Sequence, residues 1–393
     1  MKRAQIKAID SFVIPVSEKT NWIMLEIRTD DGLSGYGEAT FAGAEEAVLA
    51  EIGHARALIV DKSLAIPGEV LAAVQLAHMP EARRIVAAAL EQACLDTLAR
   101  RAGVSLAEML GGPAHRDVAV YANINRGIPD RSPAGFAARA RTVVEEDGYT
   151  AVKIAPFDAL HWARSDAATG ARLLASGIER IVAVRTAVGD EIGLLVDCHS
   201  RLSPVMARAV LREVEDLHLF WLEEPLHEQA FDQTAARALR SYANDRGVRI
   251  AGGEQLTSMI EARAFLARGG CDAILPDLRY TGLRAGMSIL ELAAACGVES
   301  SLHNPVGPIL DLVSLQVAAA LPAFLILERQ VRESPLFDQI CGGPMPLVDG
   351  RLALPGDAGI GATPDRATMA RLAVIQVRRS ATFAGMQGAG PNA

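Results

Sequence analysis

The first hundred residues change from an alternating pattern to a helical one. Apolar and polar positions alternate over residues 6–16, 22–28 and 33–38, and Asp30-Asp31-Gly32 supplies a turn before the third stretch. From residue 44 to residue 101 the chain is rich in Ala, Leu and Glu, and apolar residues after Pro80 recur at helical spacing. The pattern predicts a small antiparallel sheet followed by helices, which is an α+β domain.

Beyond the break at Gly111-Gly112-Pro113, short apolar runs alternate with stretches long enough for helices. Such alternation predicts a parallel sheet, and eight runs within a little over two hundred residues is the count of a (β/α)8-type barrel. An open doubly wound sheet is the alternative, although no glycine-rich phosphate motif follows the first run. The runs are residues 118–122, 151–154, 193–196, 219–222, 249–251, 273–275, 298–302 and 324–327.

The alternation is lost after Phe337, where prolines and glycines become frequent. We therefore predict three parts: an N-terminal α+β domain over residues 1–117, a barrel over 118–335, and a C-terminal segment over 336–393. The middle of that segment is expected to pack on the N-terminal domain. The Gly/Pro-rich run from Gly385 is expected to be disordered.

Composition and charge narrow the class of protein. Half of the 393 residues are hydrophobic and the formal net charge is −8, so nothing resembles the basic stripe of a nucleic-acid or anionic-membrane binder. The five cysteines are scattered without a C-x-x-C pair, which argues against a disulfide framework or a zinc site. Lys7 and Asp10 interrupt any signal-peptide core, and no run approaches the roughly 18 apolar residues of a membrane helix. We expect a cytoplasmic protein.

An ionisable residue stands at the end of seven successive apolar runs. In barrel enzymes the active site is built at the C-terminal ends of the strands, so these side chains are predicted to share one rim. Polar residues often end strands for structural reasons, but seven in order are not expected by chance. They are Lys153, Asp197 with His199, Glu223, Glu254, Asp277, His303 and Glu328.

Three of these residues, Asp197, Glu223 and Glu254, are carboxylates on adjacent strands. Three carboxylates brought together repel one another, and a bound divalent cation removes that cost. Oxygen ligands without cysteine favour Mg²⁺ over zinc. The structural alternative is that each one is a solvated loop residue or a salt-bridge partner. The set of three favours a Mg²⁺ site.

Two histidines on the same rim are candidates for proton transfer. Asp277 and His303 end neighbouring strands, so the carboxylate can hold the imidazole in one tautomer and make it a better base. His199 follows Asp197 by two residues and should project into the same cavity, where it could donate a proton from the opposite side. A lone histidine is more often a structural residue.

Together these segments resemble the mandelate racemase branch of the enolase superfamily. The matching sequences are DDGLSGYGEA at 30–39, VKIA at 152–155, LLVDCH at 194–199, FWLEEP at 220–225, IAGGEQ at 250–255, ILPDLRYTG at 274–282, SLHNPVGP at 301–308 and ILERQ at 326–330. The resemblance implies a (β/α)7β TIM-like barrel with an N-terminal α+β capping domain that the C-terminal segment completes. It assigns Asp197, Glu223 and Glu254 to Mg²⁺, Asp277 and His303 to the acid/base dyad, and a protonated Glu328 to the substrate carboxylate.

One departure from the family pattern bears on the reaction. Racemases of this group carry a Lys-x-Lys pair at the second strand, whereas this chain reads Lys153-Ile154-Ala155. An alanine cannot be the second base of a racemisation, so Lys153 is expected to bind the substrate carboxylate. The Asp197-x-His199 arrangement resembles galactonate-type acid-sugar dehydratases instead. A racemase or epimerase, and a barrel that serves only as a binding protein, remain the alternatives.

The expected partner is a small-molecule carboxylate, and the resemblance favours a homo-oligomer. Trp22 and Asn125 are candidate substrate contacts, because the first lies beside a loop of the N-terminal domain and the second ends the first barrel strand.

Overall fold

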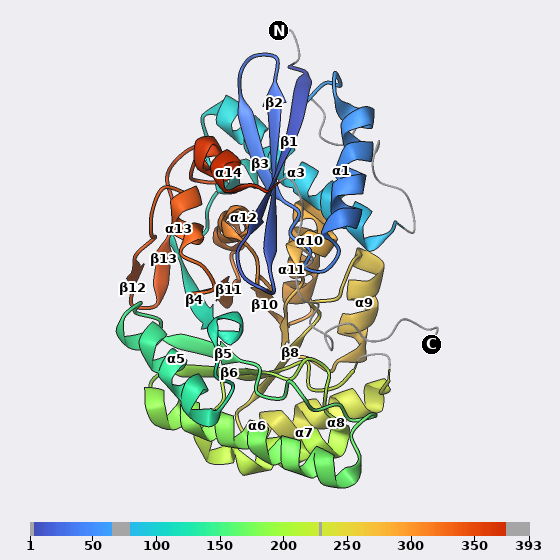
Figure 1. Ribbon diagram of the computed structural model, residues 1–393. Coiled ribbons are helices and arrows are strands. Elements are labelled where there is room, and N and C mark those ends of the chain that lie inside the picture. The colour runs from blue at the N-terminus through green and yellow to red at the C-terminus, as the bar shows by residue number, and fades with distance from the viewer. Residues whose placement is uncertain (1–3, 65–78, 228–229, 375–393) are drawn as a thin grey trace.

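The computed structural model describes residues 4–64, 79–227 and 230–374, so the disorder predicted from Gly385 lies outside the described residues. Figure 1 shows a capping domain at the top and a barrel below it, with helices α6, α7 and α8 at the bottom. No helix within the described ranges is long and apolar enough to cross a lipid bilayer.

The capping domain is built on a three-stranded antiparallel sheet in the order β1-β2-β3. The strands are β1 (Ile6–Pro15), β2 (Asn21–Thr29) and β3 (Ser34–Glu38), and helices α1 (Glu45–Ile59) and α3 (Glu81–Ala102) cover the sheet. Gly35 and Gly37 let β3 approach α3 closely: a Cβ at Gly37 would lie 2.0 Å from the carbonyl oxygen of Ala89. The predicted α+β cap is confirmed.

The barrel is a ring of eight parallel strands, and β11 pairs with β4 to close it. This closure rejects the open doubly wound alternative. The strands are β4 (Asp117–Asn123), β5 (Ala151–Ile154), β6 (Gly193–Asp197), β7 (Trp221–Glu223), β8 (Arg249–Gly252), β9 (Ala273–Ile274), β10 (Glu299–Leu302) and β11 (Ile326–Gln330).

A helical connection joins each barrel strand to the next. Within the described residues no barrel helix follows the last strand, β11, which agrees with the predicted (β/α)7β barrel. Six of the barrel helices begin after a residue whose side chain accepts a backbone N–H, which explains where they start: Ser132, Asp166, Ser203, Asp232, Ser258 and Asp277. The helices are α5 (Pro133–Glu145), α6 (Ala167–Val188), α7 (Pro204–Glu213), α8 (Gln233–Asn244), α9 (Met259–Arg268), α10 (Leu278–Thr281), α11 (Leu283–Ala295) and α12 (Pro308–Ala320).

A layer of side chains fills the barrel interior. Two aromatic rings, Tyr121 and Trp221, meet edge to face with centroids 5.4 Å apart. Small residues on other strands leave room for these rings, so the interior is packed rather than hollow. The other fully or nearly buried members are Ala151, Leu195, Ala251, Ala273, Leu275 and Ile326.

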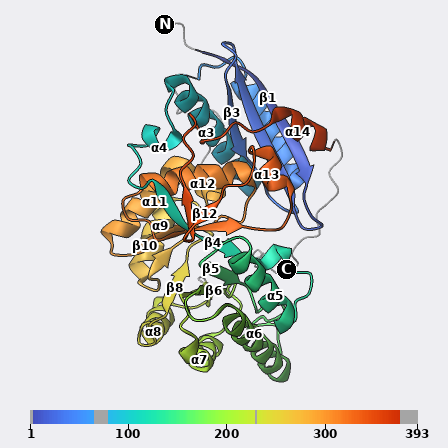
Figure 2. The ribbon, with the colours of Figure 1, turned by 90° about the vertical axis from the view of Figure 1, so that its left-hand side faces the viewer.

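The C-terminal segment packs back on both domains. It contains α13 (Leu336–Ile340), β12 (Leu347–Val348), β13 (Arg351–Ala353) and α14 (Arg366–Leu372). Strand β13 pairs antiparallel with the N-terminal half of β4, while α14 lies against β1 (Figures 1 and 2). The Val374 amide donates to the Val13 carbonyl at 2.9 Å. The cap is therefore completed by the end of the chain.

Three buried carboxylates of the cap, the seam carboxylates Glu38, Glu91 and Asp96, bind backbone amides across domain boundaries. Glu38 accepts from the Gly307 amide at 2.7 Å and the Leu310 amide at 3.1 Å, at the start of α12. Glu91 accepts from the amide of Leu283, the first residue of α11, at 2.8 Å. Carboxylates at helix N-termini are stabilising because the free N–H groups point at them.

The third seam carboxylate, Asp96, joins the cap to the C-terminal segment. It accepts from the Tyr36 amide at 2.9 Å and the Ile360 amide at 2.8 Å, and it pairs with Arg100 at 3.0 Å. Each seam carboxylate is thus matched by donors of the chain itself.

Candidate active site

The ionisable residues predicted for the rim are brought together at one end of the barrel. Contacts link them in two groups: Lys153 reaches Asp197, Glu223 and Glu328, while His303 reaches Glu254 and Asp277. The two groups are close enough that the charge of Glu328 acts on His303 and the charge of Glu254 acts on Glu223. Glu223 is the last residue of β7, whereas Glu328 lies inside β11, which runs on to Gln330. The strands do not end at the same residues as the apolar runs, but the ionisable side chains lie at one shared mouth of the barrel, as predicted.

Lys153 is the centre of the group. Its side chain is fully buried, and its ammonium lies 2.8 Å from Glu223 Oε1, 3.0 Å from Glu328 Oε1 and 3.7 Å from Asp197 Oδ2. Burial opposes the charged form, but the Glu223 and Glu328 carboxylates outweigh it and raise the pKa of Lys153 well above its usual value. One cation is shared by three carboxylates.

Glu328 is held as an acceptor in this structure, and its protonation against a substrate carboxylate stays a prediction. It receives hydrogen bonds from Asn123 Nδ2, from the Asn304 amide at 2.8 Å and from Lys153. Burial would raise its pKa, but Lys153, then His303 and the Asn304 amide, lower it instead. Three donors favour the ionised form, so in this structure the side chain orients Lys153 rather than offering a proton.

His199 lies on the Asp197 side of the mouth. Its Nε2 is 3.0 Å from Asp197 Oδ2, and its amide donates to Asp197 Oδ1 at 2.9 Å. The backbone here is strained: His199, Ser200 and Glu224 have φ values of 45°, 58° and 38°, which non-glycine residues rarely adopt. The Ser200 amide donates to the Glu224 carbonyl at 2.7 Å, which holds the two loops in this conformation.

The Asp277–His303 pair forms on the other side. His303 Nδ1 lies 2.9 Å from Asp277 Oδ2, so Nε2 is the nitrogen available for chemistry. Arg279 also clamps Asp277, with Nε 2.9 Å from Oδ2 and 3.0 Å from Oδ1. Burial opposes ionisation, yet Arg279 and His303 hold the pKa of Asp277 well below its usual range.

Glu254 faces the His303 ring. Its Oε2 lies 3.1 Å from His303 Nε2 but meets no donor in hydrogen-bonding geometry, so it is a buried acceptor without a hydrogen bond. Burial lowers the pKa of His303, but Glu254, the hydrogen bond to Asp277 and Glu328 together raise it to about 9 for the chain by itself. A cation on Glu254 would cancel the largest of these raising effects and so favour the neutral imidazole that a base requires.

The carboxylates at the mouth are of the type that binds Mg²⁺, but in this structure they contact basic side chains of the chain itself. Among the described residues, no three His, Cys, Asp or Glu side chains are already arranged around one point as ligands. Burial raises the pKa of Glu223, while Lys153 lowers it. The negative charges of Asp197, Glu328 and Glu254 add to the effect of burial, and the pKa is raised to about 8. These crowded carboxylates, together with the Glu254 oxygen that accepts no hydrogen bond from the described residues, are a set of ligands that a hard cation would complete.

The two candidate substrate contacts have internal partners. Trp22 is 2% exposed and packs edge to face on Phe337, with ring centroids 5.9 Å apart. The Asn125 carboxamide donates to Asn123 Oδ1 at 2.8 Å and accepts from the Ala155 amide at 2.6 Å. Asn125 therefore supports Asn123, which in turn holds Glu328, and contact of either residue with a substrate stays a prediction.

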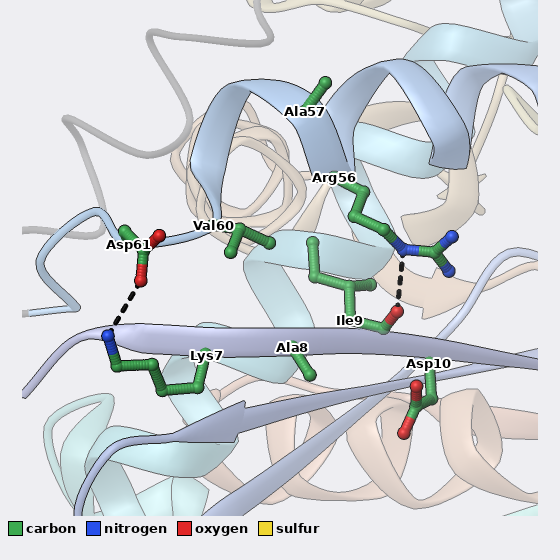
Figure 3. A pocket seen from close by; sticks show the side chains of 8 residues that line it. All are labelled: Lys7, Ala8, Ile9, Asp10, Arg56, Ala57, Val60 and Asp61. Carbon is green, nitrogen blue, oxygen red and sulfur yellow. Dashed lines mark hydrogen bonds and ion pairs between the residues drawn. The ribbon is translucent and has the colours of Figure 1, made fainter.

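A groove on the outside of the capping domain lies apart from the mouth. It is formed between β1 and α1 (Figure 3). Its polar side chains satisfy one another or the backbone, since Lys7 lies 2.7 Å from Asp61 and Arg56 Nε donates to the Ile9 carbonyl at 3.0 Å. The groove is open and has none of the crowded carboxylates of the mouth, so we assign the chemistry to the mouth.

Two side chains that the sequence patterns did not predict, Arg279 and Trp221, contact the site directly. Arg279 follows Asp277 by two residues, and Trp221 precedes Glu223 by two and donates to its Oε2 at 3.1 Å. The rule that residues i and i+2 share a face of a strand, used above for His199, would have found Trp221. Arg279 lies in α10, where Asp277 is the N-cap residue, so strand alternation gives no signal for it.

Comparisons with known proteins identify the family of the two domains. Residues 135–368 match the enolase C-terminal domain-like model, and residues 11–111 match the mandelate racemase/muconate lactonizing enzyme N-terminal domain. A D-gluconate dehydratase of Thermoproteus tenax is 31% identical, with 91% of this chain and 72% of that protein aligned. A D-xylonate dehydratase of Haloferax volcanii is 27% identical, with 88% of this chain and 83% of that protein aligned.

A solved structure shares the fold. The mandelate racemase/muconate lactonizing enzyme of Jannaschia sp. CCS1 superposes with a TM-score of 0.82 at 23% identity, covering 96% of this chain and 99% of that one. Since the two family models together match both the cap and the barrel, the chain belongs to the mandelate racemase/muconate lactonizing enzyme family of the enolase superfamily.

Proposed function

We propose that this enzyme is a Mg²⁺-dependent hydro-lyase that removes water from an aldonate-type acid sugar and yields a 2-keto-3-deoxy acid. The relatives named as D-gluconate, D-xylonate and D-galactonate dehydratases, at 26–31% identity, support this reaction class. The choice among acid sugars is left to experiment.

One observation carries the proposal: the mouth has a histidine on each side and no second lysine. His303 is oriented by Asp277, and His199 lies beside Asp197. Ala155, where a racemase of this group has its second base, is a buried alanine with 2% exposure. A β-elimination needs one base at the α-carbon and one acid at the leaving hydroxyl, and the two histidines can supply them.

The chain's own residues suffice to describe the proton movements. His303 Nε2 removes the proton from C2, while Asp277 on Nδ1 keeps the imidazole oriented and stabilises its positive charge. The C2–H electron pair forms the C2–C3 double bond, and the C3–O bond breaks as His199 gives its proton to the hydroxyl. Water leaves, and the enol becomes the 2-keto acid. Lys153, held by Glu328, neutralises part of the substrate carboxylate.

Asp197, Glu223 and Glu254 would hold the ion. When bound, Mg²⁺ supplies Lewis-acid stabilisation of the negative charge that develops on the substrate carboxylate. The positive charge of the ion would also reduce the repulsion among the crowded carboxylates, three of which share the single ammonium of Lys153.

The test is a set of acid sugars incubated with the protein and Mg²⁺, with keto acid trapped by semicarbazide. We expect product from at least one aldonate, loss of product in EDTA and recovery when Mg²⁺ is restored. Metal-dependent exchange of the C2 proton with deuterated solvent should be measured in parallel. Exchange with inversion at C2 and no keto acid would favour the racemase or epimerase alternative, and neither signal from any acid would contradict the proposal.

A further inference from the structure

The buried layer beneath the mouth contains a polar group that the proposed mechanism does not use. Trp221 is fully buried in β7, two residues before Glu223, so both side chains project into the barrel. Its indole Nε1 donates a hydrogen bond of 3.1 Å to Glu223 Oε2. A fully buried donor is thus directed at a carboxylate assigned above to the ion.

The packing around the indole fixes its orientation. Tyr121 meets it at an interplanar angle of 89° with centroids 5.4 Å apart, and Phe220 lies at 5.4 Å and 63°. Ala151, Ala251 and Ala273 belong to the same layer and provide the space that the two large rings occupy. In a close-packed interior the ring cannot turn its N–H away without displacing these neighbours.

The hydrogen bond also fixes the carboxylate. Trp221 occupies Oε2 of Glu223, so the group cannot rotate freely about its last bond, and Oε1 stays at the mouth, 2.8 Å from Lys153. A ligand oxygen held in one place before the ion arrives loses less conformational freedom on binding. Partners that orient a metal ligand typically change metal affinity or activity by about 10- to 100-fold when removed.

We propose that Trp221 is a positioning residue for Mg²⁺: its indole N–H holds Glu223 so that Oε1 is presented to the ion. The inference rests on the proposed function for the identity of the ion, and it goes beyond that function in assigning the barrel interior a part in metal affinity.

The chain offers a matched control for this proposal. Trp22 is likewise buried, at 2% exposure, but its indole Nε1 has no hydrogen-bond partner among the residues that the structure describes, and it packs on Phe337. Both substitutions, Trp221→Phe and Trp22→Phe, remove one indole N–H and leave a smaller ring in a buried site. Only the first removes a bond to Glu223.

Mg²⁺ binding to the substrate-free proteins is measured by isothermal titration calorimetry, and the thermal midpoint and circular dichroism spectrum report folding. We expect Trp221→Phe to weaken Mg²⁺ binding by about 10-fold or more, and Trp22→Phe to stay within about twofold of wild type because no bond to the site is lost. Equal affinity in Trp221→Phe and wild type would overturn the proposal, and so would an equal loss in both variants.

A second measurement keeps Trp221 in place, in case Trp221→Phe fails to fold. The chain has three tryptophans, so Trp22→Phe with Trp162→Phe leaves Trp221 as the sole indole emitter. Titration with Mg²⁺ should change its emission at the dissociation constant found by calorimetry, because the charge next to the indole N–H changes. Constant emission while calorimetry shows binding would overturn the proposal. If wild type itself binds no Mg²⁺, the proposed metal falls, and that result is distinct from failure of the Trp221 contact alone.

Discussion

The mouth and the cap–barrel seam both bury carboxylates, but they satisfy them differently. Glu38 and Glu91 at the seam each accept from backbone amides that start a helix, and Asp96 accepts from two amides and an arginine. At the mouth, one ammonium, that of Lys153, lies near three carboxylates, and Glu254 Oε2 has no hydrogen bond. Buried carboxylates that each have enough hydrogen-bond donors stabilise the fold. Crowded carboxylates with too few donors instead indicate a site where a bound ligand balances their negative charge.

The largest expected effect that tests this difference is at His303. His303→Asn removes the base but keeps a side chain of polar character, so keto-acid formation should fall by about 10³- to 10⁴-fold. The thermal midpoint and the Mg²⁺ affinity from calorimetry should stay close to wild type, because the variant leaves the seam intact. Wild-type turnover in this variant would remove the dyad from the mechanism.

His199→Asn should separate the two proton transfers. Dehydration is expected to fall by about 10²- to 10³-fold because the leaving hydroxyl has no acid, while His303 still exchanges the C2 proton with deuterated solvent. The ratio of exchange, followed by proton NMR, to keto-acid formation is the measurement. Parallel loss of both would show that His199 supports the whole site rather than the leaving group.

Glu38→Gln tests the other half of the comparison. One carboxylate oxygen becomes an amide NH₂ that faces the backbone donors of α12, so the free energy of unfolding should fall by about 2 kcal/mol, measured by urea denaturation. Mg²⁺ affinity of the folded fraction should not change. Glu51→Gln, in a part-buried pair with Arg83 that involves no backbone amide of the seam, is the control and should cost less. A loss of Mg²⁺ affinity at full stability would contradict the division between seam and mouth.

The smallest effect is expected at the groove of the cap. Lys7→Ala breaks the pair with Asp61 in an exposed position, where ion pairs contribute little. Turnover should stay within about twofold and the thermal midpoint within about 1 °C of wild type. A large fall in turnover would reassign that groove to the active site.

The elements and the rim residues could be predicted because they follow from local patterns. Apolar runs gave the eight strands, and the polar residue after each run indicated the shared mouth, since the C-terminal ends of parallel strands meet there. The pairing of β13 with β4 could not be predicted, because β13 is three residues long and therefore too short for an alternating pattern to be recognised in the sequence.

The charge pattern of the site was equally hidden. Whether Lys153 binds substrate or three carboxylates depends on distances between strands that are far apart in the sequence. The carboxylates follow Lys153 by 44 residues (Asp197), 70 residues (Glu223) and 175 residues (Glu328). The charge of Glu328 depends on hydrogen bonds from Asn123 and Asn304, which lie on other parts of the chain, and the sequence does not reveal these contacts. Sequence patterns place a residue on a rim; the donors around it decide its charge.

The anchoring of α11 and α12 by the cap has a consequence for protein engineering. Glu91 of α3 binds the Leu283 amide and the Arg284 side chain at the start of α11, and Glu38 of β3 binds backbone amides at the start of α12. A chimera that joins this barrel to a foreign cap without carboxylates at positions 38 and 91 would leave the starts of α11 and α12 uncapped. New substrate loops are therefore better grafted onto the existing cap than brought in by exchanging whole domains.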